Sequence, residues 1–199
     1  AQLRDDVKPL DLPYTHQLYN MGHLLTAACV HHRVTGKETF LQVAIKLGDY
    51  LYKTFAPHPR ELVHFGWNPS NIMGLVDLYR VTGERRYLDL AGVFIEMRGT
   101  VQWPHSMWGL TPRLIDPHPG DQNQNRVPLR KEHLAVGHAV TGPYLWCGAA
   151  DVIAETGDVE ALLQGACRAL VEARGMRVST WAGLSSRICY GVSTSGPSL

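Results

Sequence analysis

Three stretches of the chain share one pattern of apolar and polar positions. Each has a small polar or imidazole residue near the start of an apolar helical run, and each ends at Thr-Gly followed by a charged residue. The stretches run from 20 to 37, from 67 to 84 and from 126 to 158, and a further helical run follows each one. Their starts lie about 45 to 70 residues apart, a variable spacing that is mostly longer than the ~33 to 47 residues of common solenoid repeats. The pattern therefore predicts three helical hairpins joined by loops of variable length.

The two helices predicted in the first hairpin differ in their apolar surface. The first, from 15 to about 34, is apolar on two sides, one of which carries His23, Val30 and Val34. A helix that is apolar nearly all round is expected to be buried between neighbours. The second, from about 38 to 55, has a single apolar stripe opposite a polar one. The hairpin therefore pairs an inner helix with an outer helix.

The other two hairpins repeat this pairing. The second has an inner helix predicted at 72–81 and an outer helix at 87–97. The third has an inner helix running from about 134 to 156, and an outer helix at 159–173. Because proline lacks the amide proton of an interior helical residue, Gly142-Pro143 is expected to kink the third inner helix.

Alternating inner and outer helices predict an all-α fold of the α/α toroid class. Residues 1–174 would form an incomplete (α/α)6 barrel that serves as a partial catalytic domain. Residues 175–199 have no sustained periodicity and are rich in serine and glycine. This composition predicts an irregular tail, consistent with truncation or a shifted reading frame.

Three polar residues occupy matched positions near the starts of the inner helices, namely His23, Asn68 and His138. In a toroid the inner helices run in the same direction, so these residues would meet at one mouth, where helix N-termini also offer free N–H groups. The long segment 99–128, with two tryptophans, is expected to lie near that mouth. Imidazole, amide and indole groups suit a sugar, which needs neutral hydrogen bonds and an apolar stacking face. The alternative is that each histidine is an ordinary buried residue.

The composition narrows the class of partner. A chain of 199 residues is long enough for one domain with a hydrophobic core. Its net charge of +1 argues against nucleic acid or an anionic membrane as the main partner. No apolar run approaches the ~20 residues of a transmembrane helix. No signal peptide is visible, which favours a cytoplasmic location for the chain as given, although a longer parent could have lost a targeting signal.

Few residues suggest metal binding or acid–base catalysis. The cysteines form no CxxC pair and are expected to be mostly buried free thiols; they are Cys29, Cys147, Cys167 and Cys189. His31 and His32 point about 100° apart on a helix, so surface or core positions explain them better than a metal site. No metal site is predicted. Glu132 is the one carboxylate expected near the mouth, a weak catalytic candidate whose alternative is a solvated first-turn glutamate favoured by the helix dipole.

Five segments carry motifs that occur together in one enzyme family: 16–24, 78–88, Arg98-Gly99, 127–130 and 135–140. With them the chain resembles the glycoside hydrolases of family 127, formerly a domain of unknown function and typified by β-L-arabinofuranosidase. The resemblance covers about residues 11 to 175. Its most specific part is Pro-x-Arg followed by Gly-His-Ala-Val.

The resemblance implies an α/α barrel followed by β-sandwich domains, with sugar-binding histidines at His23 and His138. Asn68 stands where the family has a third histidine; it can hydrogen-bond a hydroxyl but cannot carry a proton, which leaves room for a different substrate. The family's cysteine nucleophile, its acid/base glutamate and its zinc ligands, one Glu and three Cys, come later in the barrel. Nothing in 175–199 matches them, so zinc is expected in a complete member and not in this chain.

These observations favour a fragment of a glycoside hydrolase that acts on terminal L-arabinofuranosides or related sugars. The fragment would contribute sugar-binding residues and would be inactive alone, with a small carbohydrate or glycan as its partner. Two alternatives stay open. One is a non-catalytic helical repeat scaffold that binds a protein through its concave face. The other is an α/α-barrel sugar epimerase that uses paired histidines for proton transfer.

Overall fold

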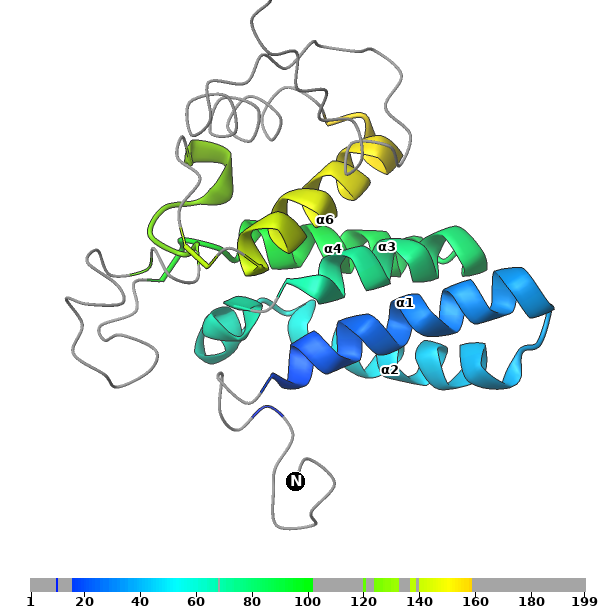
Figure 1. Ribbon diagram of the computed structural model, residues 1–199. Coiled ribbons are helices and arrows are strands. Elements are labelled where there is room, and N and C mark those ends of the chain that lie inside the picture. The colour runs from blue at the N-terminus through cyan, green and yellow to red at the C-terminus, as the bar shows by residue number, and fades with distance from the viewer. Residues whose placement is uncertain are drawn as a thin grey trace, which may run out of the picture.

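The computed structural model describes residues 10, 16–67, 69–101, 120, 124–132, 137–138 and 140–158. These residues form helices and loops, and no strand occurs among them (Figure 1). The elements are α1 (Gln17–Thr35), α2 (Thr39–Phe55), η1 (Arg60–Trp67), α3 (Ser70–Thr82), α4 (Arg85–Glu96), η2 (Leu129–Lys131) and α6 (Thr141–Thr156). The fold is all-α, as the sequence predicts. The predicted outer helix at 159–173, the boundary at 174 and the tail lie outside the described residues.

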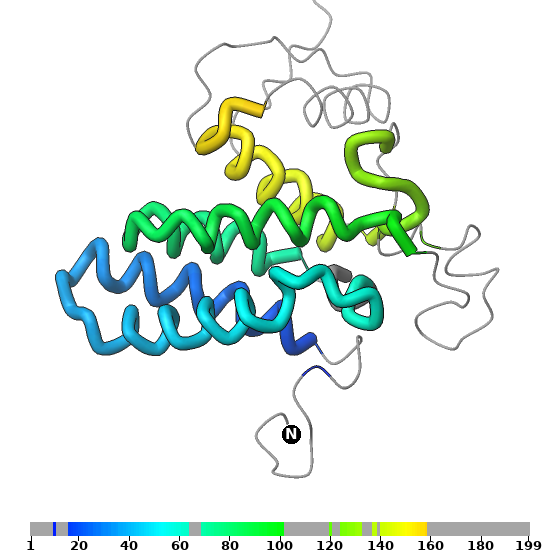
Figure 2. Tube along the Cα trace, turned by 180° about the vertical axis from the view of Figure 1, so that it is seen from behind, coloured from blue at the N-terminus to red at the C-terminus, as the bar shows by residue number. Residues whose placement is uncertain are grey.

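The helices alternate between an inner and an outer layer. The α3–α4 hairpin lies between the α1–α2 hairpin and α6 in both views (Figures 1 and 2). The inner helices α1, α3 and α6 run in the same direction. Residues near the start of one helix contact residues near the start of the next, and residues near the ends likewise contact each other. Ser70, the first residue of α3, donates to the Tyr19 carbonyl near the start of α1, and Arg80 near the end of α3 pairs with Glu155 near the end of α6. This is the arrangement of an incomplete α/α toroid.

The core lies between the two layers. A Cβ at Gly48 of α2 would stand 2.6 Å from Leu78 of α3 and 2.8 Å from Tyr87 of α4, so the absence of a side chain lets the outer helices close onto the inner ones. Phe55 and Phe94, at the ends of α2 and α4, place their ring centroids 4.7 Å apart. These side chains are almost completely buried, and burial of such aromatic and leucine residues supplies most of the apolar stabilisation.

Each inner helix ends in the same cap. At the end of α3, the Thr82 hydroxyl donates to the Leu78 carbonyl at 2.7 Å and accepts from the Glu84 amide at 3.2 Å. Gly83 adopts a left-handed φ of 74° and donates its amide to the Tyr79 carbonyl. The ends of α1 and α6 repeat both threonine bonds and the left-handed glycine. The repeated Thr-Gly-charged motif is therefore a helix stop, because glycine enters this conformation without a Cβ clash.

The third inner helix starts later than the sequence pattern predicts. The α6 helix begins at Thr141, so His138 precedes it, and the helix is continuous from Thr141 to Thr156. The reason is the position of Pro143, which lies in the first turn, where an amide proton is not needed. In a longer helix the proline ring would clash with the carbonyl four residues earlier. Val140, which lies within the inner helix predicted from about 134 to 156, is 49% exposed.

The prediction that the first inner helix is buried between neighbours is wrong for one of its sides. Val30 and Val34 are 43% and 78% exposed, whereas Leu25 and Ala28 are buried. Among the described residues, α2 and α3 cover only the sides that carry the buried positions. Apolar periodicity shows which positions avoid water, but a helix side is buried only where another segment lies against it.

Two loops that contain segments of the family resemblance, at Gly99 and at Val127, pack directly against each other. Gly99 has φ +68°, and a Cβ on it would stand 1.9 Å from the Val127 carbonyl carbon. Its amide donates to the Asn125 side-chain oxygen, and the Asn125 amide group donates to the Val101 carbonyl at 3.2 Å. The glycine after Arg98 is therefore required by close contact between the loop after α4 and the loop before η2.

Candidate functional site

The starts of the three inner helices meet at one end of the bundle. The Ser70 hydroxyl, at the start of α3, donates to the Tyr19 carbonyl of α1 at 3.0 Å. A Cβ at Gly22 would stand 2.4 Å from the Asn71 amide nitrogen, so α1 and α3 touch backbone to backbone. Tyr144, in the first turn of α6, reaches the His23 ring of α1. The sequence-based expectation that the N-terminal ends gather at one mouth therefore agrees with the described helices.

His23 stands in an aromatic cluster at this end. Its ring centroid lies 4.4 Å from that of Tyr19 and 5.5 Å from that of Tyr144, in both cases edge to face. The two tyrosine rings are 6.0 Å apart. Burial raises the pKa of Tyr144, and a side-chain hydrogen bond with Tyr19 raises it further. The His23 Nε2 atom is buried and has no hydrogen-bond partner among the residues that the structure describes. A buried imidazole nitrogen in this state is costly unless water or a ligand meets it.

His138 lies three residues before α6 and is exposed. Its Nδ1 accepts from the Val140 amide at 3.1 Å, with the Thr141 amide at 3.5 Å. These amides belong to the helix N-terminus, so the imidazole caps α6 in the way that a short polar side chain usually does. The Val140 carbonyl in turn accepts from the Tyr144 amide at 3.4 Å. His138 and His23 are thus joined through the first turn of α6.

The remaining predicted site residue, Asn68, lies outside the described residues, as does most of the 99–128 segment with its two tryptophans. Its neighbour Pro69 caps the start of α3, the helix whose first residue bonds to α1 beside His23. A common role of Asn68 with His23 and His138 in binding a sugar stays a prediction.

Glu132 is not the solvated first-turn glutamate that the alternative interpretation expected. It follows η2 rather than opening a helix, and it is 4% exposed. Both carboxylate oxygens accept from the Arg126 guanidinium, at 2.9 and 2.6 Å. This bidentate geometry is the strong form of a carboxylate–guanidinium contact. Its candidacy as a catalytic acid stays a prediction, and the contact accounts for its burial without one.

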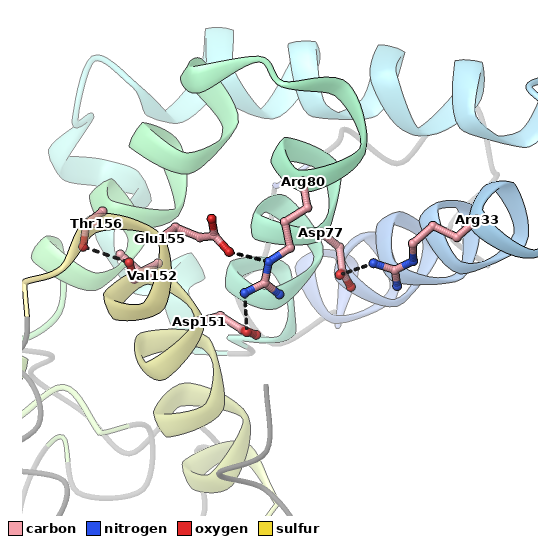
Figure 3. A network of polar contacts seen from close by, with 7 residues as sticks. All are labelled: Arg33, Asp77, Arg80, Asp151, Val152, Glu155 and Thr156. Carbon is pink, nitrogen blue, oxygen red and sulfur yellow. Dashed lines mark hydrogen bonds and ion pairs between the residues drawn. The ribbon is translucent and has the colours of Figure 1, made fainter. Parts of the chain in front are cut away.

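A cluster of ion pairs, which the sequence analysis does not predict, joins the inner helices nearer their C-terminal ends (Figure 3). Arg80 of α3 contacts Asp151 at 3.0 Å and Glu155 at 2.6 Å, both on α6. Burial raises the pKa of Asp151, and the nearby Arg80 guanidinium only partly opposes this shift. Burial alone would lower the pKa of Arg80, but its contacts with Glu155 and Asp151 outweigh this effect and raise the pKa. The sequence feature that could have predicted this contact is the presence of opposite charges on two otherwise apolar inner helices.

A pocket of about 320 Å³ lies elsewhere, between α4 and the C-terminal end of α6. Its polar lining includes Arg85, Asp89, Glu96, Arg130 and Asp158. Arg130 bridges Glu96 at 2.7 Å and Asp158 at 2.8 Å across it. Neither predicted sugar-binding histidine lines this pocket, and the chain continues from its rim into residues that are not described. We therefore place the candidate site at the aromatic cluster, where the orphaned imidazole nitrogen lies.

The described residues do not fit a zinc ion. They contain no group of three or more histidine, cysteine or acidic residues that could hold a metal. Cys29 is fully buried, and burial raises the pKa of its thiol to about 12, which disfavours the thiolate that zinc requires. Zinc in a complete family member stays a prediction.

Among the described residues, none of the helices has the length and apolar character to cross a membrane.

Comparison with known proteins gives a consistent result. A family model described as beta-L-arabinofuranosidase, GH127 catalytic domain, matches residues 2–167. A non-reducing end beta-L-arabinofuranosidase from Bifidobacterium longum subsp. longum is 34% identical over 160 residues, covering 72% of this chain and 23% of that protein. The chain thus spans about a quarter of the length of this relative.

Solved structures resemble it as well. The crystal structure of a GH127 beta-L-arabinofuranosidase from Geobacillus stearothermophilus T6 superposes with a TM-score of 0.68 at 30% identity, covering 85% of this chain and 27% of that one. A structure described as a glycoside hydrolase gives 0.62 at 39% identity, covering 75% and 22%. These values extend the agreement from local motifs to the arrangement of the helices.

Proposed function

Because the chain belongs to the GH127 beta-L-arabinofuranosidase catalytic-domain family, we propose that it forms one sugar-binding wall of a glycoside hydrolase barrel. The parent acts on terminal L-arabinofuranosides or closely related sugars. His23, Asn68 and His138 bind sugar hydroxyl groups. The chain alone supplies binding groups and not the chemistry of bond cleavage.

The observation that carries this proposal is the buried Nε2 of His23 at the shared end of α1, α3 and α6, which has no hydrogen-bond partner in the described part of the chain. A hydroxyl group can donate to or accept from a neutral imidazole nitrogen, so a sugar offers the partner that the protein withholds. The surrounding phenol rings add the apolar contact that a sugar ring uses. The family relationship names the class of sugar, since its relatives are described as β-L-arabinofuranosidases.

The proposed lack of cleavage rests on chemistry. Covalent glycoside cleavage needs an activated nucleophile and a proton donor on opposite sides of the anomeric carbon. The Cys29 thiol of α1 is fully buried, and burial raises its pKa to about 12, so it is a poor nucleophile. Glu132 is held in its contact with Arg126. Both reactive groups are therefore expected from polypeptide beyond these residues in the parent.

The test is sugar binding by the 199-residue chain, followed by NMR during titration with L-arabinose. We expect weak, saturable shifts in the wild type and strongly reduced binding in His23→Ala and His138→Ala. Lys46→Ala, on the exposed side of α2, is the matched control and should bind as the wild type does. Equal binding by all four proteins, or none by the wild type, would argue against a sugar-binding wall.

A further inference from the structure

The His23 ring is contacted by side chains from two helices that are far apart in the sequence. Tyr19 stands one helical turn before it on α1, and Tyr144 reaches it from the first turn of α6. The interplanar angles are 75° for Tyr19 and 78° for Tyr144, so the two phenols meet the imidazole at nearly right angles. Such edge-to-face pairs are favoured over stacked ones and restrict rotation of the central ring.

Tyr144 is the only one of these contacts that depends on the tertiary structure, since Tyr19 is on the same helix as His23. Its ring also lies 6.0 Å from that of Tyr19, at an interplanar angle of 80°. The three rings thus form a closed set in which each contacts the other two. The Tyr144 backbone amide donates to the carbonyl of Val140, which lies two residues after the capping His138.

We propose that Tyr144 is a positioning residue, which holds the His23 imidazole in the orientation that presents Nε2 to a sugar hydroxyl. The inference rests on the proposed function and adds a residue to it. An unrestrained imidazole can turn about its outer side-chain bond, and ordering it on binding costs affinity. With the ring already held by two phenols, this cost is met when the protein folds. The unpartnered Nε2 also supports the inference, because no group among the described residues forms a hydrogen bond with that nitrogen.

The experiment compares Tyr144→Leu, Tyr144→Phe and wild-type 199-residue chain in L-arabinose titrations. Leucine keeps bulk and helix propensity but removes the ring, whereas phenylalanine keeps the ring edge and removes only the hydroxyl. Losing one edge-to-face contact should weaken sugar binding about threefold to tenfold in the leucine variant. The phenylalanine variant should stay within about twofold of the wild type. Tyr50→Leu, on α2 and 38% exposed, is the matched control and should not change affinity.

A second readout is independent of sugar. Long-range proton–nitrogen NMR of the His23 ring should show changed shifts in Tyr144→Leu, largely restored shifts in Tyr144→Phe, and unchanged shifts in Tyr50→Leu. Unchanged His23 ring signals in a folded Tyr144→Leu protein would overturn the inference, as would wild-type sugar affinity in that variant. If the wild-type chain binds no arabinose, the proposed function fails, while the ring signals still decide whether Tyr144 positions His23. If Tyr144→Leu does not fold, loss of the wild-type ring signals in Tyr144→Phe would overturn it.

Discussion

Gly22 of α1 and Gly74 of α3 face each other where the two inner helices touch. A Cβ on Gly74 would stand 2.6 Å from the Gly22 carbonyl oxygen and 2.9 Å from the Leu25 Cβ. Backbone and a short side-chain stem cannot rotate away from an added methyl group, so the helices would have to separate. This close approach brings the start of α3 beside His23.

Gly74→Ala should therefore destabilise the protein by about 1–3 kcal/mol, as overpacked substitutions in well-packed cores do. The matched control is Gly92→Ala on α4, where an added Cβ meets nothing within 4 Å. There the change should stabilise by about 0.5–1 kcal/mol, because alanine has the higher helix propensity. Urea unfolding of both variants gives the comparison. A Gly74→Ala protein as stable as Gly92→Ala would show that α1 and α3 are not in backbone contact.

Two glycines with nearly equal φ separate conformational strain from steric conflict. Gly36, at the end of α1, has φ +69° and open space at its Cβ position, whereas Gly99 has φ +68° and the Val127 carbonyl there. Gly36→Ala should cost about 1–2 kcal/mol, the usual cost of the left-handed conformation for an L-residue. Gly99→Ala should cost clearly more, since the loop before η2 must also move. Thermal unfolding measures both, and similar losses would contradict the contact between the two loops.

Removing the charge of Glu132 tests its contact with Arg126. Glu132→Gln should destabilise by about 3 kcal/mol, the low end of the values for broken buried pairs, because the Arg126 side chain is 24% exposed. Asp89→Asn is the exposed control, since Asp89 and Arg85 are 56% and 63% exposed, and should change stability by no more than about 0.5 kcal/mol. Urea unfolding near neutral pH gives both values. A stable Glu132→Gln protein would reopen the question of why this carboxylate is buried.

Asp151 should make the stability depend on pH. Burial raises its pKa above the ordinary value of 3.8, so the folded protein favours the protonated carboxyl. Its contribution to stability is then fully present below pH 3.8 and is lost as the pH rises through the folded-state pKa. The unfolding free energy of the wild type minus that of Asp151→Asn should accordingly fall between acid and neutral pH. A difference that grows with pH would mean that the contact with Arg80 outweighs burial.

The 199-residue chain should not release sugar from an aryl β-L-arabinofuranoside, even with zinc and a reducing agent present. Binding groups alone do not supply a nucleophile or a proton donor. The exposed Val30 and Val34 on α1 also predict association or poor solubility of the isolated chain. A chromogenic assay of purified protein checks the first point, with His138→Ala as the control. Turnover above that control would make Glu132 and Cys189 the first residues to re-examine.

The helices and their ends could be predicted because their signals are local. The Thr82 hydroxyl bonds to the carbonyl four residues earlier and to the amide two residues later, so the Thr-Gly motif carries the complete cap within a few residues. The same holds for the single apolar stripes of α2 and α4, whose periodicity is set by helix geometry. The prediction at Pro143 was wrong because this proline lies in the first turn of α6 and not in the interior of a longer helix.

The candidate site could be predicted only in part. The residue pattern predicts an all-α repeat of inner and outer helices, with His23 and His138 near the starts of two inner stretches. Three features come from packing between distant segments: Arg126 binds Glu132, one side of α1 is exposed, and Tyr144 contacts His23. The contact of Arg80 with Glu155 is of the same kind, joining residues 75 positions apart. Such contacts depend on how whole helices lie against one another, and no pattern within a single helix specifies its neighbour.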